Sequence, residues 1–162
     1  MTAEEGLHRS AAAVAAILAA AAPDTRVRQL EASTRTAAEA SAALGCEPGA
    51  IANSLVFVAD DGPVLILTSG AHRVDLKLVE AVTDLAMLRR ATPDEVRAAT
   101  GQSIGGVAPI GHPVPLRTLV DRDLARHATV WAAAGTPHAV FPTTFDQLIE
   151  LTDGSPTQVA VD

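Results

Sequence analysis

The segment from Thr100 to Pro115, TGQSIGGVAPIGHPVP, is the part of the sequence best suited to hold a reacting group. Its apolar Ile104, Val107 and Ile110 predict partial burial, which a solvated linker would not need. Regular structure is prevented by glycines, which permit positive φ, and by prolines, which fix φ and lack an N–H: Gly101, Gly105, Gly106, Gly111, Pro109, Pro113 and Pro115. A rigid loop with free backbone N–H groups can hold a carbonyl or phosphate oxygen. The alternative is a plain connector between two elements.

The same loop contains a G-x-S-x-G pattern, Gly101–Gly105, which is typical of serine esterases. Acids and histidines follow it in the order of a catalytic triad: Asp121 or Asp123, then His127 or His138. The esterase motif requires a strand before the serine and a helix after it. Here a capped helix precedes Ser103, and Gly106 and Pro109 rule out a regular helix after it. We therefore expect Ser103 not to be a nucleophile.

Two single residues outside the loop are also candidates. Asn53 places an amide at the mouth of an apolar strand, where an unpaired polar group costs about 1–3 kcal/mol. Its ordinary role would be to cap a turn or strand. His138 follows a Gly-Thr-Pro turn and precedes a predicted helix. None of the histidines has the spacing of a metal site: His8, His72, His112, His127 and His138.

Charge excludes one class of function. The net charge is −7 and the pI is near 5.1, which argues against a non-specific nucleic-acid binder. Docking of one RNA end on a local basic patch remains open. Three clusters could supply such a patch: Arg26, Arg28 and Arg35; His72, Arg73 and Lys77; and Arg89 with Arg90.

The N-terminal stretch and the single cysteine indicate a cytoplasmic protein without a membrane anchor. Residues 11–22 are apolar but too short to span a bilayer, and Glu4 and Glu5 precede them instead of a basic region. Thr2 and Glu5 form the capping box of a helix over residues 3–22. Cys46 alone cannot form an internal disulfide, and we expect it to be a small packed residue of a protein in a reducing compartment.

The elements that must position these residues form, by prediction, one domain of 162 residues with an N-terminal helix (1–23) and a core (26–162). The strongest signals are a hairpin around Asp60–Pro63, buried on both faces, and helices capped by Thr36, Thr92 and Thr144. Predicted strands cover 26–30, 54–59, 64–68, 87–90, 117–120, 129–133 and 158–161, and predicted helices cover 37–44, 75–82, 92–99 and 144–151. Short strands interleaved irregularly with short helices predict an α+β fold with a mixed sheet.

Five blocks of the sequence, in this order, resemble the YbaK/prolyl-tRNA synthetase editing-domain family of aminoacyl-tRNA deacylases, from about Arg26 to the C-terminus. They are Ala38–Gly45, Ile51–Phe57, Arg73–Lys77, Thr100–Gly111 and Ala134–His138. The resemblance implies a partly barrel-like mixed sheet flanked by helices. It also implies a trans-acting deacylase that hydrolyses the ester of a small amino acid on a mischarged tRNA.

Roles for single residues also follow from the resemblance. Asn53 and Gly106 are assigned to catalysis, with Asn53 orienting water or substrate. The backbone amides of Gly106–Ala108 are expected to hold the ester or ribose, and His138 to help set the pocket size. The residues assigned to substrate binding are Thr36, Ser54, Gly105, Val107, Ala108, Pro109 and His138. The implied partners are the aminoacylated tRNA 3′ end and an aminoacyl-tRNA synthetase, with no DNA, membrane, metal or cofactor.

One departure from the family concerns the charge at the site. The family's characteristic lysine, which opens its K-S-L-V-F run, is Asn53 here. A lysine attracts phosphate and stabilises developing negative charge, whereas an amide forms only uncharged hydrogen bonds. The alternative function is therefore a non-catalytic binding module of the same fold, which lost its activity together with the lysine.

Overall fold

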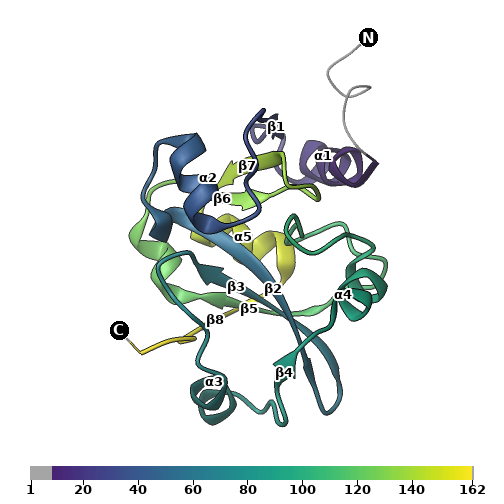
Figure 1. Cartoon of the computed structure of the whole chain (residues 1–162), viewed down its shortest axis with the longest axis vertical. Helices are drawn as coiled ribbons and strands as arrows, with labels where there is room; N and C mark the ends of the chain where they lie inside the picture. Colours follow the sequence, from purple (N-terminus) through teal and green to yellow (C-terminus); the bar gives the residue numbers. More distant parts are fainter. Residues whose placement is uncertain (1–8, 162) are drawn as a thin grey trace.

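A hairpin of two long strands forms the centre of the fold. The computed structural model describes residues 9–161. Strands β2 (Ile51–Ala59) and β3 (Gly62–Ser69) pair antiparallel along most of their length (Figure 1). The predicted hairpin is therefore confirmed. Its turn is tighter than expected, because Gly62 and Pro63 already belong to β3 and only Asp60 and Asp61 lie between the strands.

Six shorter strands extend this hairpin into one mixed sheet within the described residues. The order is β1-β7-β6-β2-β3-β5-β8, and β4 pairs with β2 beside this path. The pairs β2–β6, β3–β5 and β5–β8 are parallel and the others antiparallel. The strands are β1 (Arg28–Gln29), β4 (Arg89–Arg90), β5 (Arg117–Asp121), β6 (Val130–Ala133), β7 (Ala139–Thr143) and β8 (Ser155–Thr157). The predicted α+β class with a mixed sheet is confirmed.

The helices begin where the capping residues predicted them. Thr36, Thr92 and Thr144 each accept a backbone N–H three residues further on through the side-chain oxygen. Helices α2 and α4 end at Gly45 and Gly101, which adopt the left-handed conformation. The α-helices are α1 (Arg9–Ala21), α2 (Ala37–Leu44), α3 (Leu76–Val82), α4 (Pro93–Thr100) and α5 (Phe145–Thr152), and short 3₁₀ helices cover Pro48–Ala50 and Arg122–Arg126.

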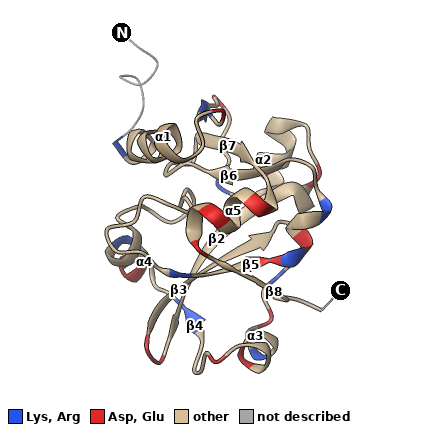
Figure 2. Cartoon of the chain, turned by 180° about the vertical axis from the view of Figure 1, so that it is seen from behind, with Lys and Arg blue, Asp and Glu red and all other residues tan. Residues whose placement is uncertain are grey.

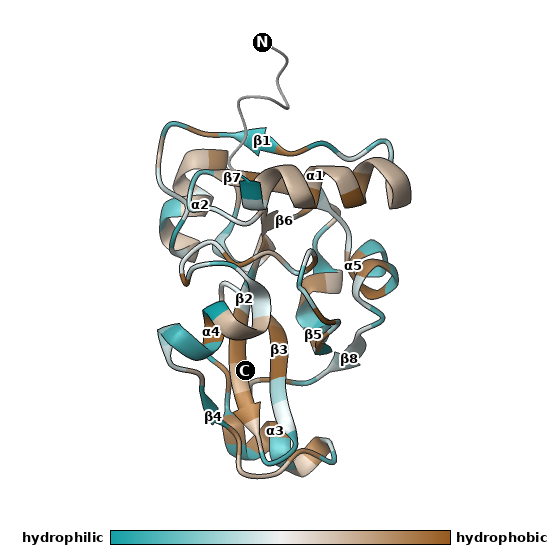
Figure 3. Ribbon diagram, turned by 90° about the vertical axis from the view of Figure 1, so that its right-hand side faces the viewer, coloured by the Kyte–Doolittle hydropathy of each residue, from teal (hydrophilic) through white to brown (hydrophobic). Residues whose placement is uncertain are grey.

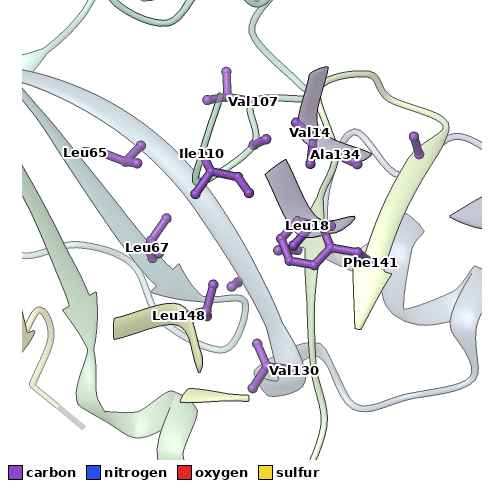
Figure 4. Packing of buried hydrophobic residues seen from close by; sticks show 14 of the residues in the cluster. Val14, Leu18, Leu65, Leu67, Val107, Ile110, Val130, Ala134, Phe141 and Leu148 are labelled. Atoms are coloured by element: carbon purple, nitrogen blue, oxygen red, sulfur yellow. The ribbon is translucent and has the colours of Figure 1, made fainter. Parts of the chain in front are cut away.

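The central hairpin is buried on both faces, as predicted, and it is strongly apolar (Figure 3). On one face Leu65 and Leu67 share a core with α1 and with the loop of residues 101–115, called the central loop below. Figure 4 shows Val14, Leu18 and Phe141 in the same cluster. On the other face Phe57 and Ile66 pack with α3. Alternate residues of each strand therefore serve two separate cores.

Some predicted strands were wrong. Residues 158–161 form no strand, and the last strand is β8 instead. Val159 and Ala160 are nevertheless buried, because they pack beneath α3 and the Val159 carbonyl accepts the Asp75 N–H at 2.8 Å. Strand β7 was not predicted, and the strands predicted at 26–30 and 87–90 shrink to two residues each.

Helix α1 begins at Arg9 in the described residues, so the predicted capping box of Thr2 and Glu5 lies outside them. The helix packs onto the core through Ala11, Val14 and Leu18. In residues 9–161, no helix has both the length and the apolar character needed to cross a membrane.

Candidate active site

A cavity of about 490 Å³ opens between β2, the end of β6, α2 and the central loop. Its walls are largely apolar, with few polar groups, as is usual for sites that bind small molecules. The lining residues are Thr34, Arg35, Ala40, Leu44, Ile51, Ala52, Asn53, Ser54, Leu55, Arg90, Ile104, Gly105, Gly106, Val107, Trp131, Ala132, Ala133 and Val140. Segments far apart in the sequence therefore meet at one hollow.

The cavity exists because two neighbours of β2 cover only the ends of one of its edges. Parallel pairing with β6 ends where Ala52 lies opposite Ala132. Antiparallel pairing with β4 begins only where Phe57 lies opposite Arg90. Residues 53–55 therefore lie at a gap in the sheet, while their other edge stays paired with β3.

The central loop forms another wall and is held by buried side chains. Gln102 is only 4% exposed, and its Oε1 accepts the Ala108 N–H at 2.7 Å. His112 donates from Nε2 to the Ala108 carbonyl oxygen at 2.8 Å. Burial lowers the pKa of His112 from its usual 6.5, which favours the neutral ring. Both polar groups of Ala108 are thus engaged inside the protein.

At Gly106 the central loop packs directly against the backbone of the turn at Thr136 and Pro137. A Cβ atom at this position would lie 2.4 Å from the Thr136 carbonyl carbon and 2.7 Å from the Pro137 nitrogen. The space beside the Gly106 α-carbon is therefore filled by this backbone. The preceding Gly105 has φ of +92° and lies under the Arg35 side chain. Among the described residues, the N–H groups of Gly105, Gly106 and Val107 have no hydrogen-bond partner.

Asn53 presents a free amide at the cavity. The residue is half-buried, and within residues 9–161 its side chain makes no hydrogen bond. Its cross-strand neighbour is Thr68, whose buried Oγ1 also lacks a partner among the described residues. The buried Oγ of Ser54 has no partner there either. Buried polar groups are normally hydrogen-bonded, so unpaired ones beside a cavity are suited to contact a ligand.

Arginines line the rim of the cavity. Arg35 and Arg90 are exposed, and neither forms an ion pair within the part of the chain described. Arg28 lies over the Trp131 ring at 5.2 Å from its centroid, which adds a third guanidinium beside the wall. No Asp or Glu is among the lining residues. The basic strand β4 is visible beside β2 in Figure 2. An acidic protein thus has a locally cationic site.

The structure brings together five of the residues predicted for the site: Asn53, Ser54, Gly105, Gly106 and Val107. The other four do not line the cavity. Thr36 caps α2, Ala108 is fully buried, and Pro109 borders a different hollow beside α1. His138 is exposed at a second hollow of about 760 Å³, on the turn that Gly106 contacts.

Sequence reasoning did not assign Thr34, Arg35, Arg90 or Trp131 to the site. The basic clusters containing Arg35 and Arg90 were visible, and Trp131 is the only tryptophan in the chain. No local sequence pattern predicted that Arg90 and Trp131 come together, because the pairing of β4 and β6 with β2 does this.

A comparison with known families identifies the fold. A model of the family described as the aminoacyl-tRNA editing domain matches residues 31–151. The chain belongs to this editing-domain family. The resemblance noted in the sequence is therefore confirmed, and all residues that line the cavity of this editing domain lie within the matched range.

Individual relatives agree with this assignment. A solved structure proposed to be a trans-editing enzyme for prolyl-tRNA synthetase is 43% identical, with a TM-score of 0.90, and the match covers 97% of this chain and 100% of that one. The uncharacterised protein YwhH of Bacillus subtilis is 31% identical over 125 residues, 76% of this chain and 79% of YwhH. The proline–tRNA ligase of Levilactobacillus brevis is 29% identical over 85 residues. That match covers 52% of this editing domain and only 15% of the ligase.

Other candidate chemistry lies outside the cavity of this editing domain. Ser103 is exposed on a turn after α4, and Asp121 contacts His72 rather than His127 or His138. The three possible metal ligands His72, Asp121 and Asp123 lie close together, but they bond to one another. His72 Nδ1 lies 2.8 Å from Asp121 and Nε2 lies 3.0 Å from Asp123. Both ring nitrogens are thus occupied, and Asp121 also accepts the backbone N–H of Ser69.

Proposed function

We propose that this protein hydrolyses the ester of a mischarged aminoacyl-tRNA as a trans-acting deacylase. The observation that carries the proposal is the cavity itself. It combines the unpaired Asn53 amide with the unpaired loop N–H groups of Gly105–Val107 and a rim containing Arg35 and Arg90. Its volume of about 490 Å³ lies in the usual range of small-molecule sites. An aminoacylated nucleoside with phosphates is a ligand of this size and charge.

The reaction needs little from the protein beyond positioning and hydrogen bonds. Water attacks the ester carbonyl carbon, the bond to the ribose oxygen breaks, and a proton from the water ends on that ribose oxygen. Donors of the loop stabilise the negative charge that develops on the carbonyl oxygen. Asn53 orients the water or the ribose. No His, Cys, Asp or Glu is among the lining residues, so we propose a reaction independent of a metal.

The proposed amino acid is small. A synthetase rejects a slightly smaller amino acid by only about 1–3 kcal/mol, so a second site that removes the wrong product is needed. The similarity to a protein proposed to edit for prolyl-tRNA synthetase supports a tRNA specific for proline and that synthetase as a functional partner. Such substrates are found in the cytoplasm, where the sequence also indicated that this protein belongs.

The alternative is a binding module that retains tRNA but has lost catalysis. The neutral Asn53 at the position of the family's lysine favours this alternative, because the site then lacks one cation near the reacting ester. The arginine rim would serve such a module equally well.

A deacylation panel tests the proposal. Excess protein is mixed with proline tRNA carrying alanine, serine, cysteine or proline, and the loss of labelled amino acid is followed. We expect faster loss of at least one small amino acid than in buffer alone, with prolyl-tRNA spared. Retention of all four labels together with tight binding of the tRNA would favour the binding module. Absence of both hydrolysis and binding would exclude both functions.

A further inference from the structure

We propose that the aminoacyl group binds as a one-residue strand extension on the open edge of β2, at the backbone of Ser54. This inference rests on the proposed function, because it specifies how the same cavity recognises its substrate. The ligand class is an α-aminoacyl ester with a free α-ammonium group.

The direction of the Ser54 backbone follows from the pairing of its neighbours. In a strand, the N–H and C=O of one residue point to the same edge, and successive residues alternate between the two edges. The Val56 carbonyl accepts the Ala91 N–H at 3.1 Å, so Val56 faces the edge that carries β4. Ser54 lies two residues away and must face the same edge.

This edge is open at Ser54. Pairing with β6 ends at Ala52 and pairing with β4 begins at Phe57, so neither strand reaches Ser54. Within residues 9–161, neither the N–H nor the C=O of Ser54 has a partner on this edge, and its buried Oγ is also unpaired. Ser54 lines the cavity, and the unpaired groups therefore border the space that a substrate would fill.

An α-aminoacyl ester has the groups that such an edge requires. Its ammonium and its ester carbonyl flank one α-carbon, as the N–H and C=O do in a strand residue. The ammonium can donate to the Ser54 carbonyl, and the ester carbonyl can accept the Ser54 N–H. These are the two hydrogen bonds of a closely spaced antiparallel pair.

The length of the gap selects a single residue. Residues 53–55 span about 7 Å at roughly 3.3 Å per residue, with β6 and β4 bounding the two ends. A longer peptide would collide with one of these strands. The nucleotide part of the substrate can instead extend out of the cavity toward Arg35 and Arg90 at the rim. The site should therefore discriminate against acyl groups that lack the ammonium and against acyl groups extended at the nitrogen.

Three adenosine analogues, each with a stable amide in place of the ester, test this inference. One carries alanyl, one carries propionyl and lacks the amine, and one carries N-acetylalanyl. Binding is followed by the fluorescence of Trp131, the only tryptophan, which lines the cavity. A charged hydrogen bond accounts for about a ten- to hundredfold difference in affinity. We expect the alanyl analogue to bind at least tenfold more tightly than both others.

The Ser54→Ala variant separates the side chain from the backbone, because it removes Oγ and keeps the backbone N–H and C=O. Loss of the Oγ contact should weaken all three analogues together, while the alanyl analogue stays at least tenfold tighter than the propionyl analogue. An affinity ratio near one in this variant would assign recognition to the side chain and overturn the inference. Binding of all three analogues within about twofold would also overturn it, while the proposed function would stand. Failure of every analogue to bind, with no deacylation in the tRNA panel, would remove the proposed function as well.

Discussion

Gly106 has no room for a side chain, and this follows from protein packing rather than from the substrate. Its added Cβ would meet the Thr136–Pro137 peptide at under 3 Å, and backbone atoms cannot move aside cheaply. A larger side chain at this position would therefore separate the loop from the turn.

We predict that Gly106→Ala lowers the free energy of unfolding by about 1–3 kcal/mol, the typical cost of overpacking. Gly45→Ala is the control. Gly45 has a φ of +67° but no atom within 4 Å of an added Cβ, so only backbone strain of about 1–2 kcal/mol is expected there. Urea unfolding measures both variants. A Gly106→Ala variant as stable as the parent would show that the two backbones do not touch in solution.

His112 makes stability depend on pH. Its pKa is lowered by burial, so the unfolded chain takes up a proton near pH 6.5 while the folded chain resists it. Stability from this group is therefore full above pH 6.5 and is lost as pH falls below it.

We predict that the unfolding midpoint in urea falls between pH 7.5 and pH 5 more steeply in the parent than in His112→Gln. The glutamine variant should be less stable at pH 7.5, because the hydrogen bond to the Ala108 carbonyl changes, but it lacks the titrating ring. Parallel curves for the two proteins would contradict this account of His112.

At the scale of elements, local signals predicted most of the helices and the central hairpin. Thr36, Thr92 and Thr144 cap helices through bonds to their own near neighbours, so the sequence alone identifies them. Strands β7 and β8 were missed because their position depends on distant partners. Strand β7 contains Pro142 and is defined by its pairing with β6 and β1 rather than by its own pattern.

The same distinction applies to the site. The loop residues Gly105–Val107 and Asn53 could be predicted, because each lies in a local pattern shared with the family. Arg90 could not be assigned, because it reaches the cavity only through the pairing of β4 with β2. Ala108 was assigned to substrate binding, but its backbone N–H donates to the side chain of Gln102. No local sequence pattern predicts such a hydrogen bond.

Helix α4 leads the chain into the central loop, and a capping box fixes the N-terminus of this helix. Thr92 Oγ1 accepts the Glu95 N–H at 3.2 Å, and Glu95 Oε1 accepts the Thr92 N–H at 2.9 Å. We predict that Thr92→Ala lowers the free energy of unfolding by about 0.5–2 kcal/mol, measured in urea. Thr92→Ser keeps the oxygen and should cost far less. Equal losses in both variants would mean that the methyl group, not the cap, is what matters.

At the scale of the whole molecule, the charge is negative and the site is positive. The net charge of −7 opposes general binding to RNA, so the proposed function requires the arginines at the cavity to supply the affinity for tRNA. Each phosphate contact with single-stranded nucleic acid contributes about −0.7 to the slope of log K against log salt.

We predict that the double variant Arg35→Ala, Arg90→Ala binds aminoacylated tRNA at least tenfold more weakly and with a salt slope shallower by about 1–1.5. Arg73→Ala is the control, because Arg73 is exposed in a basic cluster that does not line the cavity. Filter binding over a range of salt concentrations measures the slope. An unchanged slope in the double variant would place the RNA on another surface.

The most direct test of the account is single-turnover deacylation by the parent, Asn53→Ala and Asn53→Lys on the same mischarged tRNA. We predict measurable hydrolysis by the parent and a two- to tenfold slower rate for Asn53→Ala, since one uncharged hydrogen bond contributes about 0.5–1.5 kcal/mol. Asn53→Lys restores the family's charge and should hydrolyse at least as fast as the parent. Background rates in all three proteins, across several aminoacyl groups, would contradict the claim that this chain is a deacylase.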